Sequence, residues 1–135
     1  MSTDTIALAF DAPQLHERLQ RMSDTELDAL DFGVIGFDAE GAVRRYNHYE
    51  ASAAMFDVQH TLGQHVFVEV APCLNNFMVA GRFDEAFSDA RALDETLPYV
   101  LTFRMRPTRV MLRLLAPVGA GLRYVLVQRT RKETA

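Results

Sequence analysis

The sequence predicts an α+β domain in which short helices flank a five-stranded antiparallel sheet. Apolar runs with a period of two come in pairs joined by short turns, and helix-capping patterns precede short apolar segments near the start of the chain. With 135 residues, of which 49% are hydrophobic, the chain can bury one core but is too short for two domains. We therefore expect one domain over 1–135, with a helical N-terminal cap over 1–29 and a core over 30–135.

The N-terminal cap is expected to consist of two short helices. Asp11 precedes a proline and the apolar residues Leu15 and Leu19, whose spacing is helical, and Gln14 occupies the reciprocal capping position. The run Ser23-Asp24-Thr25-Glu26 repeats the capping-box pattern ahead of a second helix. We expect both helices to pack on the sheet as a lid.

Apolar runs with a period of about two predict strands at 32–37, 43–46, 98–105, 108–115 and 122–129. A polar turn at 38–41 makes the first two a hairpin, and Gly119-Ala120-Gly121 turns between the last two. Between these groups, the spacing of apolar residues predicts a helix whose sheet-facing side consists of Val79, Phe83, Phe87 and Ala90.

Cys73, the only cysteine, is the first candidate for a functional residue. A single thiol excludes an internal disulfide and a zinc site built on cysteines, which leaves buried apolar packing, a nucleophile or a covalent attachment point. Ala71 and Pro72 stiffen the backbone before the thiol, and the run Leu74-Asn75-Asn76-Phe77-Met78 after it has the loop-then-helix character of a pocket wall. A cysteine hydrolase or transferase would also need a base near the thiol, for which the sequence offers His48, His60 and His65.

Tyr46 and Glu50 form the second candidate group. If a helix begins after Asn47, a good N-cap, Tyr46 ends a strand and Glu50 lies on the first helical turn, so that their side chains can converge. A phenol and a carboxyl kept protonated by burial would both donate hydrogen bonds to an anionic oxygen. The alternative is an ordinary buried tyrosine and a solvated glutamate favoured by the helix dipole.

A third candidate feature is the apolar face of the strand expected at 98–105. Tyr99, Leu101, Phe103 and Met105 alternate along this strand and so share one side. That side is either part of the core or the wall of a ligand pocket.

Composition and motifs argue against several functional classes. Lys and Arg number 14 against 18 Asp and Glu, giving a net charge of −4, so we expect no nucleic acid or membrane partner. No run approaches the roughly 20 apolar residues of a membrane span, and the first residues lack the basic region of a signal peptide, so we expect a cytoplasmic protein. Scattered histidines and the absence of nucleotide or hydrolase motifs predict neither a metal site nor an enzyme.

The chain resembles the photoactive yellow protein family, a light-sensing branch of the PAS fold. The resemblance rests on Val-Ala-Pro-Cys at 70–73, Tyr-Asn at 46–47, Glu50, Gly63, Gly81 with Phe83, and Met105 in Met-Arg-Pro-Thr-Arg-Val. The register holds from Phe10 through Asp31-Phe32-Gly33 to Arg129, with one inserted residue near 88–95. The resemblance implies a PAS fold with a five-stranded antiparallel sheet, flanking helices and a helical cap.

The resemblance also implies a cofactor, p-coumaric acid, held covalently on Cys73 as a thioester. The backbone N–H of Cys73 would then bind the chromophore carbonyl, and Tyr46 and Glu50 would bind the phenolate. Met105 matches a position linked in the family to the return of the chromophore to its resting isomer.

Two positions depart from the family pattern. Ala54 stands where the best-known member has a Thr that hydrogen-bonds the Tyr, and Phe56 stands where it has an Arg that shields the pocket. Loss of the hydroxyl and of the positive charge is expected to change the phenol pKa and the colour of the chromophore.

The function implied by the resemblance is that of a blue-light photoreceptor. Trans–cis photoisomerisation is followed by proton transfer from Glu50, and the newly buried carboxylate is expected to drive a rearrangement that loosens the cap. The alternative is a non-photosensory PAS domain that binds a ligand or senses redox state through an unacylated Cys73; a cysteine hydrolase ranks last. We expect a downstream signalling protein as partner, and a monomer or weak dimer.

Overall fold

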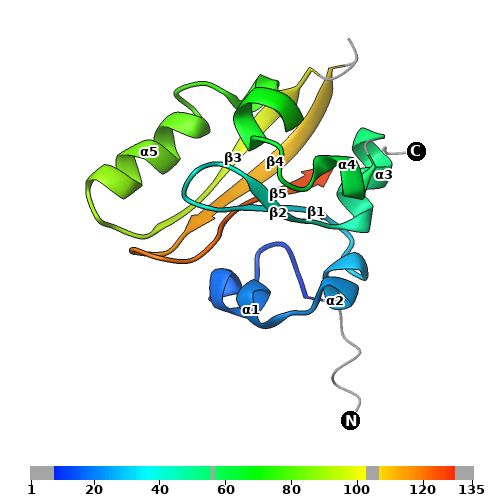
Figure 1. The fold of residues 1–135 in the computed structure, drawn as a ribbon, viewed down its shortest axis with the longest axis horizontal. Coiled ribbons are helices and arrows are strands. Elements are labelled where there is room, and N and C mark those ends of the chain that lie inside the picture. Colours follow the sequence, from blue (N-terminus) through cyan, green and yellow to red (C-terminus); the bar gives the residue numbers. More distant parts are fainter. Residues whose placement is uncertain (1–7, 56, 103–106, 130–135) are drawn as a thin grey trace.

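A computed structural model describes residues 8–55, 57–102 and 107–129 of the chain (Figure 1). Its centre is one five-stranded sheet with the order β2-β1-β5-β4-β3, in which every neighbouring pair is antiparallel. The strands are β1 (Gly33–Phe37), β2 (Val43–Tyr46), β3 (Leu93–Leu101), β4 (Thr108–Ala116) and β5 (Arg123–Arg129). The predicted α+β class and antiparallel sheet are confirmed.

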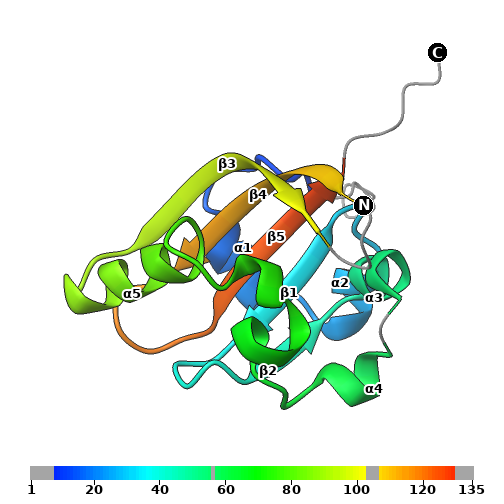
Figure 2. The same cartoon turned by 90° about the horizontal axis from the view of Figure 1, so that it is seen from above.

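Helices cover both faces of this sheet (Figures 1 and 2). One face carries α3 (His48–Ala54), α4 (Val58–Thr61), a π-helical turn η2 (Val66–Val70), a 3-10 turn η3 (Pro72–Leu74) and α5 (Ala80–Ser88). The opposite face carries α1 (Leu15–Arg21) and α2 (Asp24–Asp28), the two helices predicted for the N-terminal cap. None of the helices in the described ranges is long and apolar enough to cross a membrane.

The two faces of the sheet bury separate apolar clusters because side chains alternate along each strand. In β5, Val125 and Val127 belong to the cluster under η2, η3 and α5, while Tyr124 and Leu126 belong to the cluster under the cap. We call these the site-side cluster and the cap-side cluster. Val125 and Val127 thus lie on the same face of the sheet as the Tyr46 side chain, and Cys73 packs against the cluster on that face.

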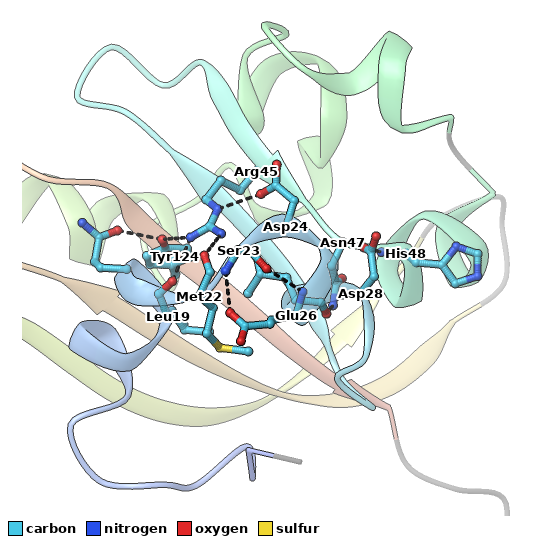
Figure 3. A network of polar contacts seen from close by, with 12 residues as sticks. Leu19, Met22, Ser23, Asp24, Glu26, Asp28, Arg45, Asn47, His48 and Tyr124 are labelled. Carbon is cyan, nitrogen blue, oxygen red and sulfur yellow. Dashed lines mark hydrogen bonds and ion pairs between the residues drawn. The ribbon is translucent and has the colours of Figure 1, made fainter. Parts of the chain in front are cut away.

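The cap is attached to the sheet through Arg45 of β2 (Figure 3). Its guanidinium donates to the carbonyl oxygen of Leu19 at 2.8 Å, to that of Met22 and to the Tyr124 hydroxyl at 3.2 Å. The same side chain pairs with Asp24, 3.2 Å away.

A second arginine of the sheet, Arg113 of β4, holds the segment that precedes α1. It donates to the carbonyl oxygens of Phe10 and Ala12, both at 2.9 Å, and forms a two-pronged ion pair with Asp94. The capping box predicted between Ser23 and Glu26 is present at the start of α2.

Two predictions about the helices were wrong. Gln14 does not cap α1 through its side chain but precedes the helix in a left-handed conformation, with φ of 53°. Phe87 was expected on the buried face of α5 but is 66% exposed, and Ala86 is buried instead. The helix ends at Ser88, so Ala90 is not part of that face, and the rotation is set by Val79 and Phe83, which are buried.

The third strand begins earlier than predicted. β3 starts at Leu93 rather than Pro98, because it pairs with β4 over its full length, from Leu93 opposite Ala116 to Leu101 opposite Thr108. Phe103 and Met105, expected at the end of this strand, lie outside the described residues.

Candidate functional site

Tyr46 and Glu50 are placed by the junction between β2 and α3. Tyr46 is the last residue of β2 and is buried, and Asn47 caps α3, as predicted. The Asn47 side-chain oxygen accepts hydrogen bonds from the backbone N–H of Glu50, at 3.2 Å, and of Val34, at 2.9 Å. This cap fixes Glu50 on the first turn, where it is only 2% exposed.

Asn47 also connects this junction to the N-terminal cap. Its side-chain amide donates to the carbonyl oxygens of Leu27, at 2.9 Å, and Phe32, at 3.0 Å. Nearby, the backbone N–H of His48 donates to the Asp28 carboxylate at 2.7 Å (Figure 3). The turn that carries Glu50 is therefore bonded directly to the end of α2.

The space for the Glu50 carboxyl is provided by Gly33 of β1. A Cβ atom on Gly33 would lie 2.0 Å from Glu50 Oε1 and 3.0 Å from its carboxyl carbon. Any side chain at position 33 would therefore displace the carboxyl, which gives Gly33 a specific role in the site.

Arg129, the last residue of β5, binds the Glu50 carboxyl. Its Nη1 donates to Glu50 Oε1 at 2.8 Å and its Nη2 donates to Oε2 at 3.1 Å, a two-pronged geometry that suits an ionised carboxylate. The guanidinium also lies over the Tyr49 ring, 6.0 Å from its centre. Arg129 was not predicted as a site residue from the sequence, although it continues the alternation of Val125 and Val127 along β5 and so lies on the site-side face.

Burial controls the ionisation of these groups. Burial raises the pKa of Glu50 above its usual value, and the hydrogen bonds and positive charge of Arg129 oppose that rise. Burial also raises the pKa of the Tyr46 phenol, and the nearby Glu50 adds to the effect. Tyr46 is thus held as a neutral hydrogen-bond donor.

Cys73 lies in η3, directly after Pro72, and is partly buried against the site-side cluster. Its carbonyl oxygen accepts a hydrogen bond of 2.6 Å from the Tyr99 hydroxyl. The Asn76 side-chain amide donates to the same hydroxyl at 2.6 Å. Tyr99 therefore links β3 to the turn that carries the thiol.

The structure brings several of the predicted site residues into one apolar cluster. Tyr46 and Leu101 are buried members of the site-side cluster, and Cys73 and Tyr99 pack against it. Ala54, the last residue of α3, is also buried. Phe56, Phe103 and Met105, also predicted for the site, lie outside the described residues.

The three histidines considered as bases for Cys73 have other partners. His48 contacts the Ser52 hydroxyl, His60 pairs with Asp57, and His65 accepts a hydrogen bond from the backbone N–H of Phe67 at the start of η2. Among the described residues, no group of three or more His, Cys, Asp or Glu side chains could hold a metal ion.

The residues present fit the p-coumaroyl group that the resemblance implies. Cys73 offers a partly accessible thiol, and the surrounding cluster is apolar and aromatic. The Tyr46 phenol is buried and its raised pKa keeps it neutral, so its hydroxyl is able to donate a hydrogen bond to a ligand oxygen. The neighbouring cation, Arg129, suits a site that receives an anion.

Comparison with known proteins assigns the family. The chain is 31% identical over 120 residues to a photoactive yellow protein from Halochromatium salexigens, covering 89% of this chain and 95% of that protein. No model of a protein family matches the chain. Among solved structures, the photoactive yellow protein domain of the sensor histidine kinase Ppr from Rhodospirillum centenum superposes with a TM-score of 0.77 at 30% identity, over 84% of this chain and 99% of that one.

More distant structures share the fold alone. A PAS domain of an HTR-like protein from Haloarcula marismortui superposes with a TM-score of 0.53 at 15% identity, over 87% of this chain and 98% of that one. The sheet order, the two helical layers and the relatives together lead to one assignment. The chain has the PAS fold and belongs to the photoactive yellow protein family.

Proposed function

We propose that this chain is a blue-light photoreceptor that carries p-coumaric acid as a thioester on Cys73, and that it signals without being an enzyme. The observation that carries the proposal is the composition of the site. A partly accessible thiol packs on the same apolar cluster as a neutral phenol donor, which in turn lies near a buried carboxyl that can exchange a proton. Membership of the photoactive yellow protein family supports it.

Each residue of the site has its own role in this proposal. Cys73 holds the chromophore, whose chemistry is light absorption and trans–cis isomerisation of its double bond. Tyr46 donates a hydrogen bond to the phenolate oxygen, and so does Glu50 in its protonated form. Tyr99 fixes the turn that presents the thiol, and Leu101 contributes to the apolar lining.

The proposed signal passes from Glu50 to the cap through Asn47. When Glu50 gives its proton to the phenolate oxygen, its side chain becomes charged in a buried position, which favours a shift of the first turn of α3. That turn is hydrogen-bonded to Asn47, and Asn47 is hydrogen-bonded to Leu27 at the end of the cap. A shift there loosens the cap, and the loosened cap is the signal read by a downstream protein.

The partner and setting are also proposals. In Rhodospirillum centenum the similar domain is part of a sensor histidine kinase. We propose that the present chain likewise acts on a signalling protein, in the cytoplasm, as a monomer or weak dimer.

An absorption experiment tests the function. The purified protein is treated with activated p-coumaric acid, and spectra are recorded in the dark and after a blue flash. We expect a visible band that bleaches and recovers in the wild type and in a surface control, His60→Ala, and no covalent adduct in Cys73→Ala. An adduct that does not bleach would instead indicate a ligand-binding PAS domain, and the absence of any adduct would favour redox sensing or simple packing by Cys73.

A second measurement tests the path to the cap. Hydrogen exchange of the amides in α1 and α2 is compared in the dark and under continuous illumination. We expect exchange to accelerate in the light in the wild type but not in Glu50→Gln, which keeps the shape of the side chain but cannot release a proton. Equal acceleration in both proteins would contradict the role of Glu50.

A further inference from the structure

The contact between Glu50 and Arg129 is specific for the charged form of the carboxyl. Both Glu50 oxygens accept hydrogen bonds from the same guanidinium, at 2.8 and 3.1 Å. A protonated carboxyl carries a hydrogen on one oxygen, so it fits this two-pronged geometry poorly. The side chains are 3% exposed for Glu50 and 16% exposed for Arg129, so water screens the pair weakly.

Within the part of the chain that the structure describes, three ionisable groups influence this arginine. The ionisable neighbours that influence Arg129 are Glu50 and Tyr49 from α3 and Tyr46 from β2. Burial raises the pKa of Tyr46, which keeps its phenol neutral. Among the described residues, Arg129 is therefore the cation in direct contact with Glu50, and it balances one negative charge.

The single positive charge of Arg129 becomes important when a phenolic ligand is bound. This part of the inference rests on the proposed function. The ligand phenol and the Glu50 carboxyl together then hold one proton and one negative charge beside one arginine. With the proton on Glu50, the negative charge is on the ligand oxygen. With the proton on the ligand, the negative charge is on Glu50, which is the state whose contacts with Arg129 the structure displays.

We infer that Arg129 is the internal cation that captures the Glu50 carboxylate when Glu50 gives up its proton. Because this contact lowers the electrostatic cost of the buried carboxylate, that cost contributes less to the rearrangement of the cap than a carboxylate without a cation would. Arg129 thus stabilises the deprotonated state and makes its decay slower, since the two hydrogen bonds must break before Glu50 can take back its proton. Arg129 is a positioning residue: it acts on the protonation of Glu50.

The first test needs no chromophore. The protein is labelled with ¹³C at glutamate carboxyl groups, the Glu50 resonance is assigned by its absence in Glu50→Gln, and its titration is followed by NMR in wild type, Arg129→Gln and Arg129→Lys. The matched control is Arg44→Gln, which removes one positive charge at a surface ion pair with Asp38.

We expect the titration midpoint of Glu50 to rise by at least about one pH unit in Arg129→Gln, a tenfold weaker acid, because burial acts without the cation. Arg129→Lys keeps the positive charge but cannot form the two-pronged contact, so we expect a smaller rise in the Glu50 titration midpoint. If Arg129→Gln does not fold, the midpoint in Arg129→Lys is the test. Arg44→Gln should leave the midpoint unchanged. An unchanged midpoint in both Arg129 variants would overturn the inference.

The second test uses the chromophore-loaded protein. After a blue flash, infrared difference spectra follow loss and return of the protonated Glu50 carboxyl. We expect the return to be at least about tenfold faster in Arg129→Gln than in wild type or Arg44→Gln. Equal recovery rates would contradict the capture by Arg129, whereas a loaded wild type that never bleaches would refute the proposed photoreceptor and leave the titration to decide on Arg129.

Discussion

The close approach of Gly33 to Glu50 allows a quantitative prediction. In Gly33→Ala the new methyl carbon would lie 2.0 Å from Glu50 Oε1, whereas ordinary contact begins at 3.4 Å, so the oxygen must retreat by about 1.4 Å. The hydrogen bonds to Arg129 now span 2.8 and 3.1 Å, and a retreat of that size breaks at least one of them. The variant should therefore both overpack the site and lose a charge-assisted hydrogen bond.

The expected cost is about 3 kcal/mol of unfolding free energy. Overpacking in a filled core costs about 1–3 kcal/mol, and a lost hydrogen bond to a charged group costs about 1.5–3 kcal/mol. Alanine also lowers the conformational entropy of the unfolded chain, which offsets about 0.4–1 kcal/mol of this cost. For a domain of this size the melting temperature should fall by about 10 °C.

The assay is urea unfolding of the chromophore-free protein, with Gly81→Ala as control. Gly81 lies in α5, where an added methyl would meet the ring of Phe77, which is 78% exposed and can move aside. That control should be unchanged or slightly stabilised. The clash explanation fails if Gly33→Ala unfolds within about 0.5 kcal/mol of wild type, or if its cost is the same when Glu50 is replaced by alanine.

Three further predictions concern the hydrogen bonds around the site. Asn47→Ala removes four hydrogen bonds, two from each end of its amide, and should cost about 2–4 kcal/mol in urea unfolding; a cost below about 1 kcal/mol would mean that water replaces them. Ser23→Ala loses the capping box with Glu26 and should cost about 1 kcal/mol by thermal unfolding, whereas Ser23→Asp should restore most of it. Tyr99→Phe removes the hydrogen bond to the Cys73 carbonyl oxygen and should lower the free energy of unfolding by about 1 kcal/mol. It should also shift the visible absorption band of the chromophore-loaded protein. An unshifted band would mean that Tyr99 does not position the turn that contains Cys73.

Much of the fold was predictable because local patterns and tertiary structure agree. The capping box at Ser23 and the N-cap at Asn47 are formed by residues three positions apart, so the sequence contains both partners. The strands β4 and β5 are rich in apolar and β-branched residues on either side of a short glycine turn, and their bounds were predicted within one residue.

The incorrect predictions concern elements whose structure is determined by contacts between residues far apart in the sequence. The first half of β3 contains Asp94 and Glu95, which are uncommon in strands, yet it forms a strand because β3 pairs along the whole of β4. Glu95 is accommodated there by an ion pair with Arg82 of α5. On α5 itself, both Ala86 and Phe87 follow Phe83 at helical spacing, so the periodicity of the sequence could not tell which of them is buried; the structure buries Ala86.

The candidate site was predictable in part for the same reason. Tyr46 and Glu50 are close in sequence, and a helix cap between them predicted their placement. Arg129 is 79 positions beyond Glu50, and only the strand order β1-β5 brings it to the carboxyl. A long-range ion pair of this kind has no local signature, although the alternation of β5 restricts the face on which Arg129 can lie.

The way in which Arg45 and Arg113 hold the N-terminal segment has a consequence for how this segment can evolve. Four of their bonds go to main-chain carbonyl oxygens, of Phe10, Ala12, Leu19 and Met22. Every amino acid supplies such an oxygen, so these attachments depend on the path of the backbone and not on which side chains it carries. The outward-facing side chains of the cap can therefore be substituted while both arginines continue to hold its backbone in the same place.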